Sequence, residues 1–315
     1  MTARHHHYLS QCYLKGFTEG GKKPKLTVVD FKEKKLFKTR PRNVGGLRDF
    51  NRFEIEGVDP NYIETSLANF EGRAATALKN VGKSFELKCE DKDYILNLIA
   101  LFAIRSPEQR EHKRQIYAQE VEKITALSLA TKERWESQIS RMKSDGYEAG
   151  EDISYEECKA FFESKAYTIE VARERHIITE INQIEAILPY LYGRNWLLIK
   201  STEESGPFIT TDNPVNLTWN EPEKIPPLLR NSPGFGLKNT QVYFPLSRNI
   251  ALQGEFEGKE GLIQGTKELV AVLNTKMLMF TYKQVYAPQI GFYVIGREGK
   301  ILDGSGVLKE IKLTS

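Results

Sequence analysis

Residues 91–105, DKDYILNLIALFAIR, are the most strongly patterned part of this 315-residue chain. Apolar side chains recur there at spacings of three and four and form one wide stripe, which predicts an α-helix packed on a core. Asp91 or Asp93 is expected to cap its start. Ser106-Pro107 interrupts it, because the proline ring disfavours helical geometry at residue 106, and a second helix is expected to begin there.

Helical patterns continue on both sides of this stretch. Residues 61–79 carry apolar side chains at helical spacing, and residues 155–190 read as helix again. Residues 108–143 are dense in charge with thin apolar spacing, which predicts long solvated helices that form an antiparallel pair. The middle of the chain, about 61–192, is therefore expected to be nearly all helix.

Strand patterns lie at both ends of the chain. Residues 25–31 and 36–37 predict a hairpin, and a second predicted hairpin joins 292–295 to 301–302. Between them, strands are expected at 195–200, 208–210, 241–245 and 250–253, a loop at 221–239 and a helix within 266–282. The predicted fold class is α+β, with N- and C-terminal β segments forming a mixed or antiparallel sheet. Its parts are an N-terminal β segment (1–60), a helical region (61–193) and an α+β segment (194–315) that packs with the first as one composite domain.

Composition excludes several classes of protein. The formal net charge of +3 is too small to imply a nucleic-acid partner by itself, although a sum hides local patches. Three widely spaced cysteines suggest reduced thiols in a cytoplasmic protein. No signal peptide and no membrane span is evident, so no membrane association is expected. The glycine-rich nucleotide-binding, zincin and hydrolase-elbow motifs are absent from the sequence.

A histidine cluster opens the chain. His5, His6 and His7 precede an aromatic run, and imidazole suits acid–base or metal chemistry. In a strand, His5 and His7 would share one face and His6 the other. The alternative is a polar strand or part of an expression tag.

Carboxylates offer two further candidate positions. Asp212 and Asn213 follow a short apolar strand, where an acid can bind a divalent cation or orient a histidine; the alternative is a plain turn. Glu64 and Glu71 lie seven residues apart on one face of the helix at 61–79 and could hold Mg²⁺ or Mn²⁺; the alternative is a solvated pair.

One pair of residues resembles a known ribonuclease motif. Arg105 and His112 have a spacing similar to the Arg–His pair of the helical HEPN ribonucleases, which cleave RNA without metal. Pro107 would distort the helix that this motif needs.

Taken together, the motifs resemble the prokaryotic domain-of-unknown-function family numbered 4238. The most specific are HHYLSQCYLKGF at 6–17 and FITTDNPV at 208–215. The first departs at Ser10, where the family usually has proline. The other matching segments are NV at 43–44, DF at 49–50, EGRAA at 71–75, RSP at 105–107 and FPLS at 244–247. The resemblance implies that the histidines are native and that one site gathers His6, His7, Gln11, Glu71, Arg105 and Asp212. Asn213, which follows Asp212, is a further candidate for this site.

The resemblance supplies no reaction, and three hypotheses follow from the residues. The first is a metal-dependent nuclease or other phosphodiester hydrolase acting on RNA or DNA, with His7, Asp212 and Glu71 holding Mg²⁺ or Mn²⁺ and Arg105 on the phosphate. An accessory role in antiviral defence or as a toxin would fit it. The second is a non-catalytic ligand- or nucleotide-binding sensor whose helical region binds a partner protein. The third is the metal-independent ribonuclease that would use Arg105 and His112.

Overall fold

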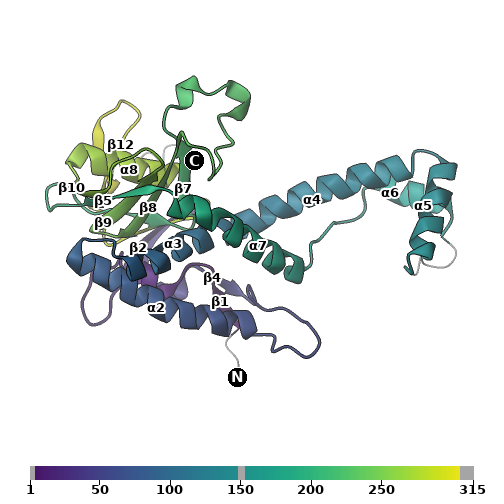
Figure 1. Cartoon of the computed structure of the whole chain (residues 1–315), viewed down its shortest axis with the longest axis horizontal. Helices are drawn as coiled ribbons and strands as arrows, with labels where there is room; N and C mark the ends of the chain where they lie inside the picture. The colour runs from purple at the N-terminus through teal and green to yellow at the C-terminus, as the bar shows by residue number, and fades with distance from the viewer. Residues whose placement is uncertain (1–3, 148–152, 306–315) are drawn as a thin grey trace. The chain divides into compact units, whose positions relative to one another are not determined.

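A computed structural model describes residues 4–147 and 153–305, and Figure 1 traces them. The chain divides into two compact units. The second is Pro107–His176, and the first combines the described residues before and after it. The predicted helical region is thus shared between the units. Within the described ranges, no helix is long and apolar enough to cross a membrane.

The helix predicted at 91–105 is confirmed as α3 (Cys89–Ile104), with Leu98 and Phe102 in the core. The predicted cap was wrong: Lys88 occupies the cap position. Asp91 lies in the first turn instead, where its charge complements the helix dipole. α2 (Tyr62–Ser84) packs along α3. α2 is longer than predicted. It continues to Ser84 and ends where Phe85 adopts the left-handed conformation.

Two larger sheets build the rest of the first unit, and Figure 1 labels the five strands of one of them. That sheet has the order β10-β5-β9-β8-β7, with β10 parallel to β5 and the other pairs antiparallel. The other has the order β3-β2-β11-β6. Because β2 from the N-terminal segment pairs with β11 from the C-terminal segment, the prediction that both ends join one sheet is confirmed. The fold class is α+β.

The strand bounds follow the predicted positions for β2, β5, β8 and β9, while β7, β10 and β11 were not predicted. The strands of the two larger sheets are β2 (Leu26–Asp30), β3 (Lys35–Thr39), β5 (Asn195–Lys200), β6 (Thr210–Thr211), β7 (Asn216–Trp219), β8 (Thr240–Ser247), β9 (Ile250–Glu255), β10 (Gly261–Gln264) and β11 (Gln284–Ala287). Two small antiparallel pairs are β1 (His5–His7) with β4 (Gly46–Arg48) and β12 (Tyr293–Ile295) with β13 (Ile301–Asp303). The remaining short elements of this unit are α1 (Gln11–Lys15), η1 (Pro41–Asn43), η2 (Pro222–Lys224), η3 (Pro227–Leu229) and α8 (Lys267–Met279).

The second unit is helical, and its first helix begins at Pro107, as predicted. It holds α4 (Pro107–Ser128), α5 (Lys132–Ser144), α6 (Tyr155–Ser164) and the start of α7 (Arg173–Tyr192). The prediction of unbroken helix over 155–190 was wrong, because Lys165 adopts a left-handed conformation and ends α6. The segment that follows is fixed to α4 by a hydrogen bond from Arg114 to the carbonyl of Ile169 (3.1 Å).

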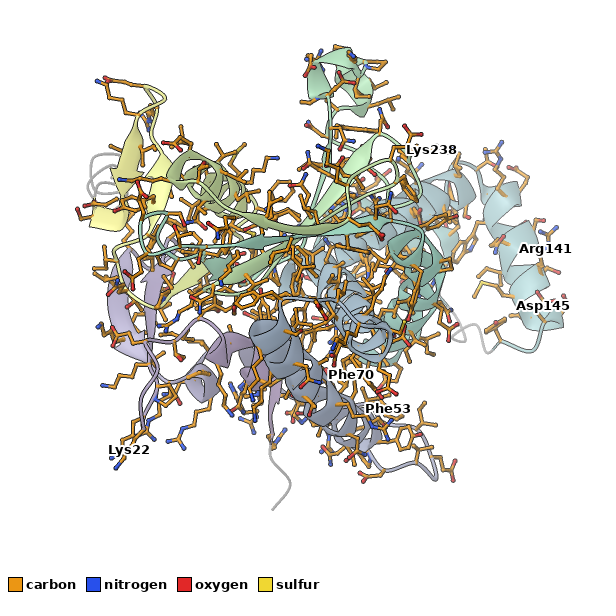
Figure 2. The ribbon with its side chains drawn as sticks, turned by 60° about the vertical axis from the view of Figure 1, so that its left-hand side comes forward. Lys22, Phe53, Phe70, Arg141, Asp145 and Lys238 are labelled. Carbon is orange, nitrogen blue, oxygen red and sulfur yellow. The ribbon has the colours of Figure 1, made fainter. Side chains whose placement is uncertain are left out.

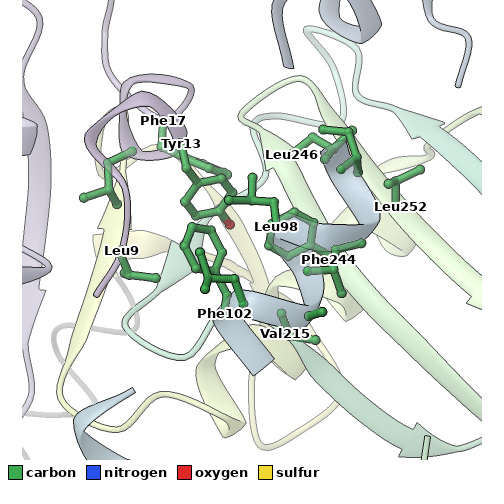
Figure 3. Packing of buried hydrophobic residues seen from close by; sticks show 14 of the residues in the cluster. Leu9, Tyr13, Phe17, Leu98, Phe102, Val215, Phe244, Leu246 and Leu252 are labelled. Atoms are coloured by element: carbon green, nitrogen blue, oxygen red, sulfur yellow. The ribbon is translucent and has the colours of Figure 1, made fainter. Parts of the chain in front are cut away.

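Tyr13 on α1 lies at the centre of the main hydrophobic core and is fully buried (Figure 3). Its ring stacks on Phe244 of β8 with centroids 5.2 Å apart and lies 5.0 Å from Phe102 of α3. The hydroxyl shares a hydrogen bond with Thr210 (2.6 Å) and donates to the carbonyl of Pro245 (2.9 Å). One side chain therefore joins α1 to α3 and to both larger sheets.

Substituting Tyr13 with phenylalanine is expected to lower the free energy of unfolding by about 1–3 kcal/mol, because buried partners lose their hydrogen bonds while the ring packing stays. Urea unfolding followed by circular dichroism measures this. Tyr62→Phe is the matched control, because Tyr62 is 58% exposed. Equal unfolding midpoints for Tyr13→Phe and wild type would contradict the role given to the hydroxyl.

Candidate active site

Strand β1 separates the three histidines as the alternation of a strand predicts. His6 is fully buried, whereas His5 is exposed and His7 is partly exposed. The rings of His5 and His7 meet edge to face with centroids 5.1 Å apart. A Cβ at Gly46 would lie 2.5 Å from Nε2 of His5, so the glycine lets this ring lie against β4. The segment thus presents two imidazoles outward and one inward.

Behind the strand, Asn51 connects the inward histidine to two charged groups. Its backbone N–H donates to Nδ1 of His6 (3.0 Å), and its side-chain amide donates to Glu64. Its side-chain carbonyl accepts from Nη2 of Arg105. Nδ1 of His6 also lies 4.0 Å from a carboxylate oxygen of Glu64.

Arg105 is a buried charge at the end of α3, with 5% of its surface exposed. Its guanidinium lies 5.5 Å from the centre of the Phe50 ring, and Nε lies 3.9 Å from a carboxylate oxygen of Glu180 on α7. This position contradicts the geometry that the HEPN hypothesis requires. Arg105 has non-helical geometry after α3 has ended, and His112 belongs to the next helix, so the two do not share one exposed helical face.

Glu64 and Glu71 lie two turns apart on α2, as predicted, and they interact. Burial, followed by the charge of Glu64, raises the pKa of Glu71 to about 7, while Arg105 opposes the rise. Burial also raises the pKa of the Cys12 thiol, and the charge of Glu71 adds to that rise. Glu71 is therefore a carboxyl group that exchanges its proton near neutral pH, as a general acid must.

His7 belongs to the same electrostatic group. Burial and the neighbouring His5 lower the pKa of His7, whereas the carbonyl of Arg42 and the charge of Glu64 favour the protonated form. Nε2 donates to that carbonyl (3.3 Å), which leaves Nδ1 as the basic atom of the neutral ring. Glu64 thus acts on both His7 and Glu71. The structure brings His6, His7, Glu71 and Arg105 together around Glu64. These residues, with Asn51 and Glu180, are called the histidine group below.

Asp212 is bound by backbone amides. Its carboxylate accepts the backbone N–H groups of Tyr282 (3.1 Å), Lys283 (2.8 Å) and Gln284 (2.9 Å), so it anchors the turn that leads into β11. It reaches the N-terminal segment at Tyr8, whose pKa is raised by burial and then by Asp212.

Asn213 forms a turn with Thr211, whose hydroxyl donates to the Asn213 carbonyl (2.9 Å) and accepts from its N–H (3.1 Å). The plain-turn alternative therefore describes this segment. Gln11 begins α1 and is partly exposed.

The predicted metal ligands do not converge. Across residues 4–147 and 153–305, no three His, Cys, Asp or Glu side chains are grouped as ligands of a metal ion. His7, Glu71 and Asp212 are not grouped as a set of metal ligands, and backbone amides bind the Asp212 carboxylate. The described residues therefore do not provide the several shared oxygen ligands that Mg²⁺ or Mn²⁺ takes.

Sequence reasoning missed two members of the group. Asn51 directly follows Asp49-Phe50, one of the segments that match the family. That position was the only indication in the sequence that Asn51 belongs to the site. Glu180 is 1% exposed among the apolar residues of α7. An acid embedded in an apolar helical stripe is a signal for a buried charge partner, since such residues are rarely buried alone.

The histidine pair lies in the most basic part of the chain. Residues 1–52 hold thirteen Lys and Arg against four Asp and Glu, a formal charge of +9 in a chain whose total is +3. All of these cations except Arg52 are exposed, and Figure 2 shows Lys22 extending away from the ribbon. Arg4, Arg42 and Arg48 are the cations nearest the histidines in sequence or strand register. Arg4 and Arg48 pair with Asp49.

Comparison with known proteins identifies the family. No curated protein and no solved structure matches the chain. The family model described as "Protein of unknown function (DUF4238)" matches residues 5–289, nearly the whole chain and all of the histidine group. The chain therefore belongs to the DUF4238 family.

Proposed function

We propose that the chain is a phosphodiesterase that cleaves nucleic acid beside β1, where the charge of Glu64 acts on both His7 and Glu71. The observation that carries the proposal is the pair of outward imidazoles, His5 and His7, in a segment with a formal charge of +9. A phosphate backbone binds such a surface by releasing counterions, whatever its base sequence. Nucleic acid therefore fits this face better than a neutral substrate does.

His7 and Glu71 supply the acid–base pair of this proposal. The neutral imidazole of His7 accepts a proton from the attacking hydroxyl, and protonated Glu71 donates one to the leaving oxygen. RNA suits such a pair, because its own 2′-hydroxyl is the nucleophile. Attack on phosphorus breaks the bond to the 5′-oxygen and leaves a 2′,3′-cyclic phosphate and a 5′-hydroxyl. Arg105 acts indirectly in this proposal. It donates a hydrogen bond to Asn51, and its charge opposes the rise in the pKa of Glu71.

Replacing His7 with alanine is expected to slow cleavage of single-stranded RNA by about 10²–10⁴-fold, the usual contribution of a general base. The measurement incubates labelled RNA, transfer RNA and DNA with purified protein, with Mg²⁺ or Mn²⁺ added or with EDTA. Because the pair needs neutral His7 and protonated Glu71, the rate should peak between the lowered pKa of His7 and about 7.

His112→Ala is the matched control, since His112 is an exposed histidine on α4. Loss of cleavage in His112→Ala but not in His7→Ala would contradict the proposal and assign the cleavage to His112. A strict requirement for metal would restore the metal-dependent nuclease hypothesis. Binding of RNA without cleavage of any polymer would make the chain a binding module.

A further inference from the structure

A pocket of about 500 Å³ lies in the first unit, and none of the histidine group lines it. It forms where the end of α2, the residues after β5, the β8–β9 turn and the residues after β11 meet. Two cations line it, Lys200 and Arg248. Its volume is within the range of small-molecule sites, about 300–1,000 Å³.

Contacts hold both cations at this pocket. Nζ of Lys200 lies 3.9 Å from the centre of the Phe85 ring, a cation–π contact. Nη1 of Arg248 donates to the carbonyl of Thr18 (3.1 Å). Of the two acids in the lining, Glu19 is already paired with Lys38, and Glu203 is exposed. Among the described residues neither Lys200 nor Arg248 forms an ion pair, so both charges can bind an anion in the pocket.

Phe85 occupies an unusual backbone position. It caps α2 in the left-handed conformation (φ 55°, ψ 32°), which glycine adopts freely and bulky residues rarely do. A residue held in a sparsely populated conformation often marks a functional site. Glycine would relieve the backbone but would remove the ring that positions Lys200 and forms one wall of the pocket.

We propose that this pocket binds a phosphorylated small molecule of the size of a nucleoside monophosphate. Lys200 and Arg248 bind the phosphate as charge-assisted hydrogen-bond donors. Phe85, Pro207 and Pro288 provide an apolar wall for the ring system. The site is separate from the histidine group and does not depend on the proposed phosphodiesterase.

Calorimetric titration of the full chain with adenosine monophosphate and with adenosine tests this. The monophosphate should bind at least tenfold more tightly than adenosine, and inorganic phosphate should compete. Lys200→Met and Arg248→Met should each weaken binding at least tenfold. Lys259→Met, an exposed lysine between β9 and β10, should not. Equal binding of both ligands, or unchanged binding in Lys200→Met, would overturn the proposal.

Two further variants test the role of the Phe85 ring and the separation of the pocket from the histidines. Phe85→Gly should weaken monophosphate binding at least fivefold; wild-type affinity in this variant would overturn the role of the ring. His7→Ala should bind the monophosphate as wild type does. Loss of binding in His7→Ala together with full binding in Lys200→Met would place the nucleotide at the histidines and refute a second site.

Discussion

A chain in which methionine replaces Arg194 is expected to lose about 3–5 kcal/mol of unfolding free energy, since each buried acceptor left unpaired costs about 1–3 kcal/mol. Arg194 is 1% exposed. Nη1 donates to the carbonyls of Thr240 (2.7 Å) and Gly254 (3.2 Å), and Nη2 donates to the carbonyl of Phe235 (2.7 Å). The guanidinium also lies 4.3 Å from the centre of the Phe256 ring. Methionine replaces most of the length but none of the donors.

Urea unfolding measures this effect, and pH 7 is a suitable condition. Burial lowers the pKa of the Arg194 guanidinium to about 10, so the group is still charged there. Arg194→Lys should fall between wild type and Arg194→Met, because it keeps a charge but cannot reach all three carbonyls. Arg297→Met replaces an exposed arginine and should change stability by less than about 0.5 kcal/mol. Arg194 donates to Phe235 in the 221–239 loop and to Thr240 and Gly254 in the sheet. If Arg194→Met and Arg297→Met had equal free energies of unfolding, these bonds would not stabilise the packing of the loop on the sheet.

Elements whose pattern is local could be predicted from the sequence, and elements defined by distant pairing could not. Strand β5 occupies the predicted residues, because a β-branched and aromatic run is bounded by polar residues on both sides. β11 was missed, since its four residues are too few for a pattern and are ordered by pairing with β2 on one side and β6 on the other. β10 is exposed throughout and lies at the edge of its sheet beside β5, so no buried face marks it.

The candidate site divides in the same way. Helical spacing put Glu64 and Glu71 on one face, and strand alternation put His6 opposite His5 and His7. Neither rule could show that Asn51 joins His6, Glu64 and Arg105, because that connection spans 54 residues. For Asp212, the chemistry of a turn and the chemistry of a metal ligand look alike in sequence. Only the three backbone donors show which one applies.

Wild type is expected to lose stability relative to Glu71→Gln as the pH rises from about 4.5 to about 7. Burial and Glu64 raise the folded-state pKa of Glu71 to about 7, above the ordinary 4.5 of the unfolded chain. Between these values the folded carboxyl is protonated and the unfolded one is ionised, so unfolding releases a proton. Stability therefore falls with pH, by at most about 1.4 kcal/mol per unit for one proton. Glutamine, which does not ionise, removes this dependence.

Urea unfolding of both proteins at pH 4, 5, 6, 7 and 8 measures it. Below pH 4.5 the unfolding free energies of the two proteins should depend on pH in the same way, because the Glu71 carboxyl is protonated in both the folded and the unfolded state. Above about 7 the glutamine variant should have gained on the order of 1–3 kcal/mol over wild type. Glu260→Gln, an exposed carboxylate, is the control. Parallel curves for wild type and Glu71→Gln from pH 4 to 8 would mean that Glu71 is ionised in the folded protein at pH 6. It could not then be the proton donor that the proposed cleavage requires, because the acid must still hold its proton at the pH where His7 is neutral.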